Sequence, residues 1–315
     1  MIPDVSVIIP TYNRSAMVSE AVASVLAQRD ASFELIIVDD GSIDRTGEQI
    51  CRLTAKSNHP VRLVTIDNRG PAAARNAGSA LAAAPLLAFL DSDDLWQPYK
   101  LKRQLALMRQ NPECAISQTD EIWLRNGQRV NPGLRHRKPR GDYFIDSLRT
   151  CLISPSATMM RTCLFHSLGG FDEDLRAAED YDLWLRLLTL YEVELLEEPL
   201  IIRRAGHPGQ LSATIPALDR FRILALLKLL SLDLSAFRRH AVCATLVEKC
   251  GVYGKGLASR GHPEQARTII GFAELAVSCW RESPHSSLPQ AIAWMRAHLS
   301  QRREHEAPLK DEYPN

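Results

Sequence analysis

The sequence predicts an α/β protein with a central, mostly parallel sheet flanked by helices, followed by an α-helical extension. Three observations support this class. Short apolar runs alternate with helical patterns over about the first 100 residues. Clusters of polar residues stand where these apolar runs end. Beyond about residue 206, the strand pattern disappears while helical periodicity continues.

Four apolar runs in the first part of the chain are expected to be strands buried on both faces, because they are rich in β-branched residues or leucine. They occupy residues 5–9, 35–38, 61–66 and 86–90. Between them, apolar residues recur at helical spacing over residues 17–26, and Pro71 can begin a helix that an alanine-rich run continues to Ala84. Strands separated by such helices indicate right-handed βαβ units and a parallel sheet.

Polar clusters follow the carboxyl ends of all four predicted strands. They occupy residues 11–14, 39–42, 68–70 and 91–94. Ligands of open parallel sheets bind beyond the carboxyl ends of the strands. The coincidence of four clusters therefore predicts a ligand site at this edge.

The cluster Asp91-Ser92-Asp93-Asp94 ends its apolar run abruptly. Neighbouring carboxylates repel one another, whereas hard cations such as Mg²⁺ or Mn²⁺ prefer oxygen ligands. The cluster therefore suits the binding of a metal-bound nucleotide diphosphate. A solvated turn rich in Asp is the alternative that this motif alone leaves open.

In the second half of the sequence, a mixed pattern of strands and helices is followed by a purely helical pattern. Asn126-Gly127 indicates a hairpin within residues 121–130. Further strands are predicted at 156–160 and 193–202, and helices at 180–190, 221–234, 241–258 and 263–280. We therefore expect a first domain over residues 1–205, a helical subdomain over 206–300 and a disordered tail over 301–315.

Composition restricts the class of protein. The formal net charge of +1 gives no reason to expect nucleic acid as a partner. The 7 cysteines form no C-x-x-C pair and are odd in number, which argues against a disulfide framework or a zinc site and fits a reducing cytosol. We see neither a secretory signal nor an apolar segment of membrane-spanning length, so a cytoplasmic location is expected.

Five motifs occur in a fixed order: VSVIIPTYNR, ELIIVDDGSIDRT, NRGPAAARNAG, FLDSDD and AEDYDLWLR. Together they resemble the family-2 glycosyltransferases of the GT-A fold, a Rossmann-like α/β architecture, over about residues 5–204. The resemblance implies transfer of a hexosyl or N-acetylhexosaminyl group from a nucleotide diphosphate sugar to a hydroxyl, with inversion. It also implies dependence on Mn²⁺ or Mg²⁺.

The resemblance suggests metal ligands. Asp93 corresponds to the main ligand, and Asp91 to the residue that holds the metal or the ribose. Asp94 has no necessary role there, so we predict that it caps a helix before Trp96. His207 stands where some GT-A enzymes have a further metal ligand, with a solvated loop histidine as the alternative.

The resemblance also suggests contacts to the donor nucleotide. Asp39 would accept a hydrogen bond from the base, and Arg75 would face the base or the phosphates. A turn residue and an exposed helix cation are the respective alternatives. The complete set of expected donor residues is Pro10, Thr11, Tyr12, Asp39, Arg75, Asp91 and Ser92.

An acceptor hydroxyl needs a general base before it can attack. In the family this base is an Asp in a Glu-Asp pair on the acceptor side, which corresponds here to Glu179-Asp180. Asp180 is therefore the predicted catalytic base, and Glu179 is assigned to the acceptor side. Both residues could instead cap the helix that begins there.

The resemblance also implies an acceptor, a growing bacterial surface glycan or glycolipid. The basic loop over residues 129–140 could contact a phosphorylated acceptor or be a solvated run of charge. The helix at 221–234 could lie on a membrane as a peripheral contact, pack in a core, or form a homo-oligomer.

Two other functions remain open from the sequence. A sugar nucleotidyltransferase would carry a glycine-rich loop after its first strand, where this chain has Pro-Thr-Tyr-Asn-Arg. A degenerate transferase domain could act as a binding scaffold, although the aspartates of the motifs are intact.

Overall fold

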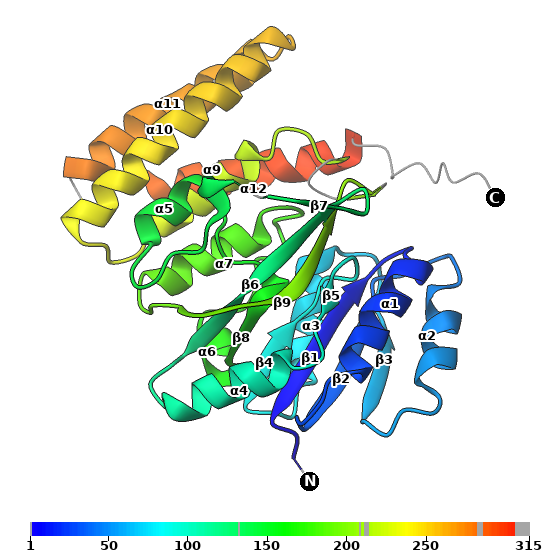
Figure 1. Cartoon of the computed structure of the whole chain (residues 1–315). Coiled ribbons are helices and arrows are strands. Elements are labelled where there is room, and N and C mark those ends of the chain that lie inside the picture. Colours follow the sequence, from blue (N-terminus) through cyan, green and yellow to red (C-terminus); the bar gives the residue numbers. More distant parts are fainter. Residues whose placement is uncertain (1, 132, 208, 211–213, 282–285, 306–315) are drawn as a thin grey trace. The chain divides into compact units, whose positions relative to one another are not determined.

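A computed structural model describes residues 2–131, 133–207, 209–210, 214–281 and 286–305 (Figure 1). The chain divides into two compact units, Met1–Ile215 and Pro216–Asn315. The first unit thus continues past the predicted boundary at residue 205, so the loop that carries His207 belongs to it.

Within the described residues, the first unit is built on a nine-stranded mixed sheet in the order β3-β2-β1-β4-β8-β6-β9-β5, with β7 paired to β6. The strands are β1 (Val5–Thr11), β2 (Phe33–Asp39), β3 (Val61–Thr65), β4 (Leu86–Phe89), β5 (Leu95–Trp96), β6 (Ile116–Arg125), β7 (Gln128–Val130), β8 (Thr158–Arg161) and β9 (Glu194–Ala205). The four predicted strands are confirmed as β1 to β4, and they pair in parallel. Strand β8 then pairs antiparallel to β4 and β6, while β6 and β9 are parallel.

Helices cover both faces of the parallel strands. The helices of the first unit are α1 (Ser15–Leu26), α2 (Thr46–Thr54), α3 (Pro71–Ala80), α4 (Lys100–Gln110), α5 (Phe144–Arg149), α6 (Thr162–Ser167) and α7 (Glu179–Leu188), with short 3₁₀ turns η1 (Leu134–His136) and η2 (Pro155–Ala157). Successive strand residues point to opposite faces. Val7 accordingly joins a core with α1 and α4, whereas Val38 packs with Ala74 of α3 on the other face.

Helix α3 lies very close to β1. It begins at Pro71, as predicted, but ends at Ala80, before the predicted Ala84. A Cβ at Gly78 would lie 2.6 Å from Cγ2 of Ile8, so only glycine permits this approach without a shift. The position of α3 relative to the sheet is therefore tightly constrained.

The predicted hairpin is also present. Strands β6 and β7 flank Asn126 and Gly127, whose positive φ angles of 51° and 76° are those that a tight hairpin turn requires. Pairing begins at Arg125 with Gln128 and ends at Trp123 with Val130, after which the strands separate.

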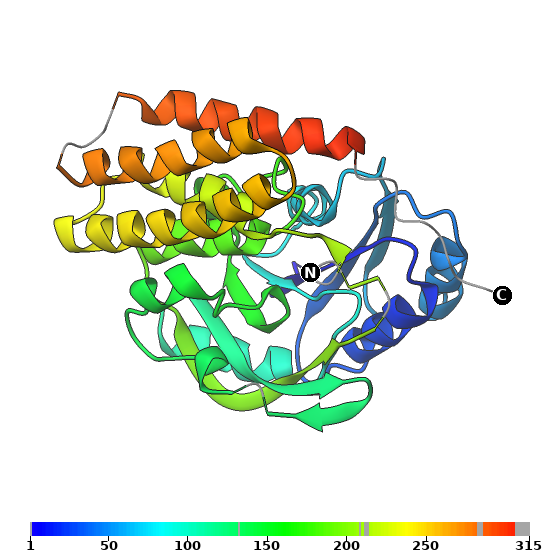
Figure 2. The same cartoon turned by 90° about the horizontal axis from the view of Figure 1, so that it is seen from above.

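The second unit is helical: α9 (Asp219–Leu229), α10 (Ala236–Ser259), α11 (Pro263–Arg281) and α12 (Leu288–His305). Helices α10 and α11 run side by side as a hairpin (Figures 1 and 2). Helix α12 continues to His305, into the segment predicted to be a tail; residues 306–315 lie outside the described residues.

The predicted amphipathic helix at 221–234 corresponds to α9, whose apolar side chains, including Phe221, Ile223 and Leu227, are buried. The interpretation of this helix as a membrane-surface contact is therefore wrong, because its apolar residues belong to a core. None of the described helices combines the length and the hydropathy that crossing a membrane requires.

Candidate active site

The loops after β1 and β2 are joined at the carboxyl edge of the sheet. Asp39, 4% exposed, lies in register with Thr11 and accepts a hydrogen bond from the Ser42 backbone N–H at 3.0 Å. The Asn13 N–H donates to Ser42 Oγ at 2.8 Å, and Asn13 Oδ1 accepts from the Ile43 N–H at 2.8 Å. The structure thus brings the predicted donor residues Asp39 and Thr11 together, with Pro10 and Tyr12 on either side of Thr11.

Asp40 links this edge to the third polar cluster. Its carboxylate accepts hydrogen bonds from the backbone N–H groups of Arg69 at 2.8 Å and Gly70 at 2.7 Å. Burial raises the pKa of Asp40 in spite of these bonds. The buried carboxylate therefore fixes the loop that enters α3.

The aspartate cluster after β4 converges with the loop after β9. Carboxylate oxygens of Asp91, Asp93 and Asp94 all lie within 4.8 Å of one another. Asp93 Oδ2 lies 3.0 Å from His207 Nε2 and 2.8 Å from Arg14 Nη1. Burial alone would raise the pKa of Asp93, but His207 and Arg14 hold it below its usual value.

Asp94 does not cap a helix, so that prediction is wrong. Strand β5, not a helix, follows Asp94. The buried Asp94 carboxylate accepts hydrogen bonds from Ser156 Oγ at 2.6 Å and from the Arg204 N–H at 3.0 Å. Burial, aided by Asp93 and Asp91, raises the pKa of Asp94 well above its usual value. Asp94 therefore joins the cluster to β9 rather than presenting itself as a ligand.

The remaining groups suit a hard divalent cation. The side chains of Asp93, Asp91 and His207 are 16%, 28% and 14% exposed, so a small ion can reach them. The two carboxylates match the preference of Mn²⁺ or Mg²⁺ for oxygen ligands, and both ions complete their shells with water and phosphate oxygens. Ser92 lies between the two aspartates and is 5% exposed.

Arg75 occupies a buried position between two carboxylates. Its Nη2 lies 2.7 Å from Asp91 Oδ1, and its Nη1 lies 2.7 Å from Glu179 Oε1. Burial alone would lower the pKa of Arg75, but Asp91 and Glu179 outweigh it and raise the pKa. The contact of Arg75 with the donor stays a prediction.

Asp180 lies in the first turn of α7, as expected. The residue before the helix is Ala178, which makes no side-chain capping bond. Asp180 Oδ1 accepts from the Tyr181 N–H at 2.7 Å, and Cys151 Sγ lies 3.5 Å from Asp180 Oδ2. Asp180 thus accepts a backbone N–H of the first turn of α7, so the capping alternative stays open, and the catalytic role of Asp180 stays a prediction.

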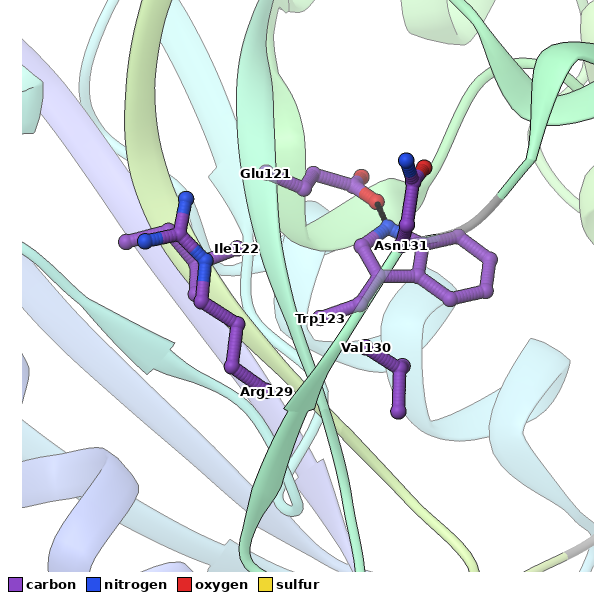
Figure 3. Close-up of a pocket in the computed structure, with 6 residues that line it drawn as sticks. All are labelled: Glu121, Ile122, Trp123, Arg129, Val130 and Asn131. Carbon is purple, nitrogen blue, oxygen red and sulfur yellow. Dashed lines mark hydrogen bonds between the residues drawn. The ribbon is translucent and has the colours of Figure 1, made fainter.

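A pocket of about 360 Å³ lies where β6 and β7 separate (Figure 3). It is lined by Glu121, Ile122, Trp123, Arg129, Val130 and Asn131. Figure 3 shows the bond of 2.9 Å that the Trp123 indole N–H donates to Glu121. The guanidinium of Arg203 covers the Trp123 ring at 4.6 Å from its centroid. The lining thus combines an aromatic ring with a carboxylate, a guanidinium and an amide.

Glu121 lies at the centre of this region. Its side chain is 2% exposed and bonds to Lys138 Nζ at 2.8 Å. Burial opposes ionisation of Glu121, but Lys138 and Arg203 keep its pKa below the usual value. Lys138 is 6% exposed, so this member of the basic loop is not part of a solvated run of charge.

A second, much smaller cavity shares two lining residues with this pocket. This cavity of about 10 Å³ is lined by Glu121, Trp123, Arg203 and Cys151 among others, and Cys151 contacts Asp180. Sequence reasoning missed Glu121, Trp123 and Arg203. The available signal was the alternation of Glu121 and Trp123, which puts both on one face of the predicted hairpin.

Comparison with known proteins identifies the family. Residues 6–167, about half of the chain, match the family described as glycosyl transferase family 2, so the chain belongs to that family. The predicted resemblance is thereby confirmed.

Similar proteins are named as glycosyltransferases. An uncharacterized glycosyltransferase of Rickettsia felis is 35% identical over 198 residues, which are 62% of this chain but 32% of the relative. The chain thus spans about a third of the length of that relative. The Escherichia coli protein named UDP-Glc:alpha-D-GlcNAc-diphosphoundecaprenol beta-1,3-glucosyltransferase WfgD is 32% identical over 185 residues, 58% of this chain and 69% of WfgD.

Solved structures share the fold. The structure of S. aureus TarS 1–349 in complex with UDP-GlcNAc has a TM-score of 0.69 and 19% identity, covering 96% of this chain and 87% of TarS 1–349. The mannosyltransferase PcManGT from Pyrobaculum calidifontis, in complex with GDP-Man and Mn²⁺, has a TM-score of 0.56 and 17% identity, covering 99% and 89%. The predicted GT-A fold with its helical extension is therefore confirmed.

Proposed function

We propose that this protein is an inverting, metal-dependent glycosyltransferase that moves a sugar from a nucleotide diphosphate sugar to a hydroxyl of a bacterial surface glycan or glycolipid. One observation carries the proposal: Asp93 of the aspartate cluster contacts His207, and Arg75 joins Asp91 of the same cluster to Glu179, the residue before Asp180. The donors bound in the TarS and PcManGT structures support a nucleotide sugar as substrate.

The donor nucleotide fits the edge formed by β1 and β2. Asp39 is the acceptor for an N–H of the base, while Pro10, Thr11 and Tyr12 line it. Ser92 and Asp91 then lie on the side of the ribose and the diphosphate. An N–H-donating base such as uracil or guanine suits this carboxylate.

The metal would be held by Asp93 and Asp91, with His207 as a further ligand. Bound Mn²⁺ or Mg²⁺ stabilises the negative charge that develops on the departing nucleotide diphosphate. Arg14, which lies 2.8 Å from Asp93, adds a fixed positive charge beside that position.

Asp180 is the general base. Its carboxylate takes the proton of the acceptor hydroxyl while the hydroxyl oxygen bonds to the anomeric carbon, and the bond from that carbon to the diphosphate breaks. Because the acceptor attacks from the side opposite the leaving group, the configuration at the anomeric carbon inverts.

The acceptor fits the side of β6, β7 and β9. The pocket beside Trp123 offers an aromatic ring with polar groups around it, a lining that suits a hexosyl or N-acetylhexosaminyl unit. The name of WfgD supports a diphosphate-linked lipid acceptor. Such an acceptor would bring this cytoplasmic enzyme to the inner face of the membrane.

The first test is Asp180→Asn. We expect transfer to fall by about 10³-fold, on the scale of lost general-base catalysis. Calorimetric titration of UDP and GDP with Mn²⁺ should show unchanged binding of whichever nucleotide the wild type prefers. Asp174→Asn, an exposed aspartate just before α7, serves as the matched control and should retain full turnover.

Undiminished turnover of Asp180→Asn would refute the base assignment. Failure of the wild type to bind either nucleotide would favour the alternative of a degenerate transferase domain that acts as a binding scaffold. Release of pyrophosphate from a nucleoside triphosphate and a sugar phosphate would favour a nucleotidyltransferase.

A further inference from the structure

We propose that Arg75 is a positioning residue that holds the metal-binding motif and the catalytic base in register, rather than a contact to the donor. This inference rests on the proposed function, because it takes Asp180 as the base. It assigns Glu179 a structural link to Arg75 instead of a contact with the acceptor.

The two terminal nitrogens of Arg75 serve different halves of the site. Nη2 bonds Asp91, which follows β4, and Nη1 bonds Glu179, which opens α7, each at 2.7 Å. A guanidinium is planar and presents its donors at fixed angles, so the two carboxylates are held at a fixed separation. Asp180 is the next residue after Glu179, and Asp93 is two residues after Asp91.

The Arg75 side chain cannot easily move. It is 6% exposed, and its guanidinium lies 5.1 Å from the centroid of the Phe171 ring. The side chain of Asn76 holds Phe171 on both sides: it donates to the Phe171 carbonyl at 2.9 Å and accepts from the Phe171 N–H at 3.0 Å. One turn further along α3, Gly78 lets the helix contact β1.

The buried carboxylate of Glu179 needs the positive charge of Arg75 beside it. Glu179 is buried, and burial raises its pKa although Arg75 opposes the shift. A buried carboxylate that loses its cation is strongly destabilised and takes up a proton or moves toward water. Loss of Arg75 therefore releases Asp91 and Glu179 together, and it displaces the first turn of α7 on which Asp180 lies.

The test is a double-mutant cycle with two readouts, nucleotide binding and turnover. Glu179→Gln keeps a hydrogen-bond acceptor for Arg75 and removes only the charge. We expect its kcat to fall about tenfold while the Kd for the preferred nucleotide with Mn²⁺ stays within about twofold. Arg75→Gln should lower kcat by about 100-fold, and the double variant should be no worse than Arg75→Gln alone.

The variant Arg75→Lys distinguishes the effect of the positive charge from the effect of holding both carboxylates at once. A lysine is a single point charge and can satisfy one of the two carboxylates, so it should recover less than about a tenth of the wild-type kcat although the charge is restored. Arg52→Gln, which alters an exposed arginine that pairs with Glu48 on α2, is the matched control and should change kcat less than about twofold.

A direct donor contact would give a different result. In that case Arg75→Gln would weaken nucleotide binding with and without Mn²⁺, and its effect on kcat would add to that of Glu179→Gln. This outcome would overturn the inference. Because the Asp180→Asn experiment is independent of these variants, an active Asp180→Asn enzyme would refute the proposed function itself.

Discussion

Lys100 is the least expected residue of the core. It lies at the start of α4 with 0% exposure, its Nζ is 3.4 Å from the Thr158 carbonyl, and it lies 3.9 Å from the centroid of the Trp96 ring. Burial, with a smaller contribution from Lys138, puts the pKa of Lys100 well below its ordinary value. The folded protein therefore releases this proton at a lower pH than the unfolded chain does.

This difference predicts a pH dependence of stability. Between the lowered pKa and that of an ordinary lysine, about 10.4, the unfolded state binds more protons, so stability rises with pH across that interval. Lys100→Met should remove the rise and stabilise the protein at neutral pH, by about 1.4 kcal/mol for each unit by which the pKa is lowered.

Urea unfolding between about pH 6 and pH 9.5 measures the slope for the wild type and the variant. Lys102→Met removes an exposed lysine of the same helix and is the control. Equal slopes in the wild type and Lys100→Met would contradict the prediction.

Single residues differ in how far the sequence could predict them. Asp93 was named from its motif and His207 from its place after the last predicted strand, and the structure brings the two within 3.0 Å. The contact of Arg75 with Glu179 joins residues 104 apart, and nothing local in either motif indicates it. Asp94 was misread because its partner Arg204 lies on β9, 110 residues later in the chain.

At the scale of elements, the hairpin of β6 and β7 shapes the proposed acceptor side. Trp123→Ala should raise KM about tenfold for a synthetic N-acetylglucosamine-diphosphate-alkyl acceptor, because stacking and exclusion of water beside Glu121 are lost. Nucleotide binding should stay unchanged, since the proposed donor edge lies on β1 and β2. Steady-state kinetics at saturating donor measures the effect.

Two further variants serve as controls for Trp123→Ala. Trp123→Phe keeps the ring and should lose less than about threefold. Gln128→Ala alters an exposed residue at the hairpin turn and should behave as the wild type. If Trp123→Ala changed the nucleotide Kd but not the acceptor KM, the proposal that this pocket binds the acceptor would be refuted.

Elements were predictable where local signals were strong. Asn126-Gly127 located the hairpin, and Pro71 located the start of α3. Helix α12 was missed because its polar end was interpreted as a tail, whereas it packs against α9. Tertiary packing of this kind decides the state of a segment whose own pattern is weak.

At the scale of the whole molecule, every residue proposed for the donor and the metal lies in Met1–Ile215. A fragment ending at Ile215 should therefore bind the preferred nucleotide with Mn²⁺ within about threefold of the full chain, because each unit has its own core. Calorimetry tests this, with circular dichroism to establish that the fragment is folded. A folded fragment that binds no nucleotide would show that the helical unit completes the site.

The bonds between distant residues also determine when the site can form. Arg75 to Glu179 and Asp93 to His207 span 104 and 114 residues. During synthesis the aspartates emerge long before these later partners, so the nascent chain carries a group of carboxylates that lacks part of its neutralising charge. Closing such long loops is costly and slow. The proposed catalytic edge therefore cannot be complete before the chain has been synthesised as far as His207.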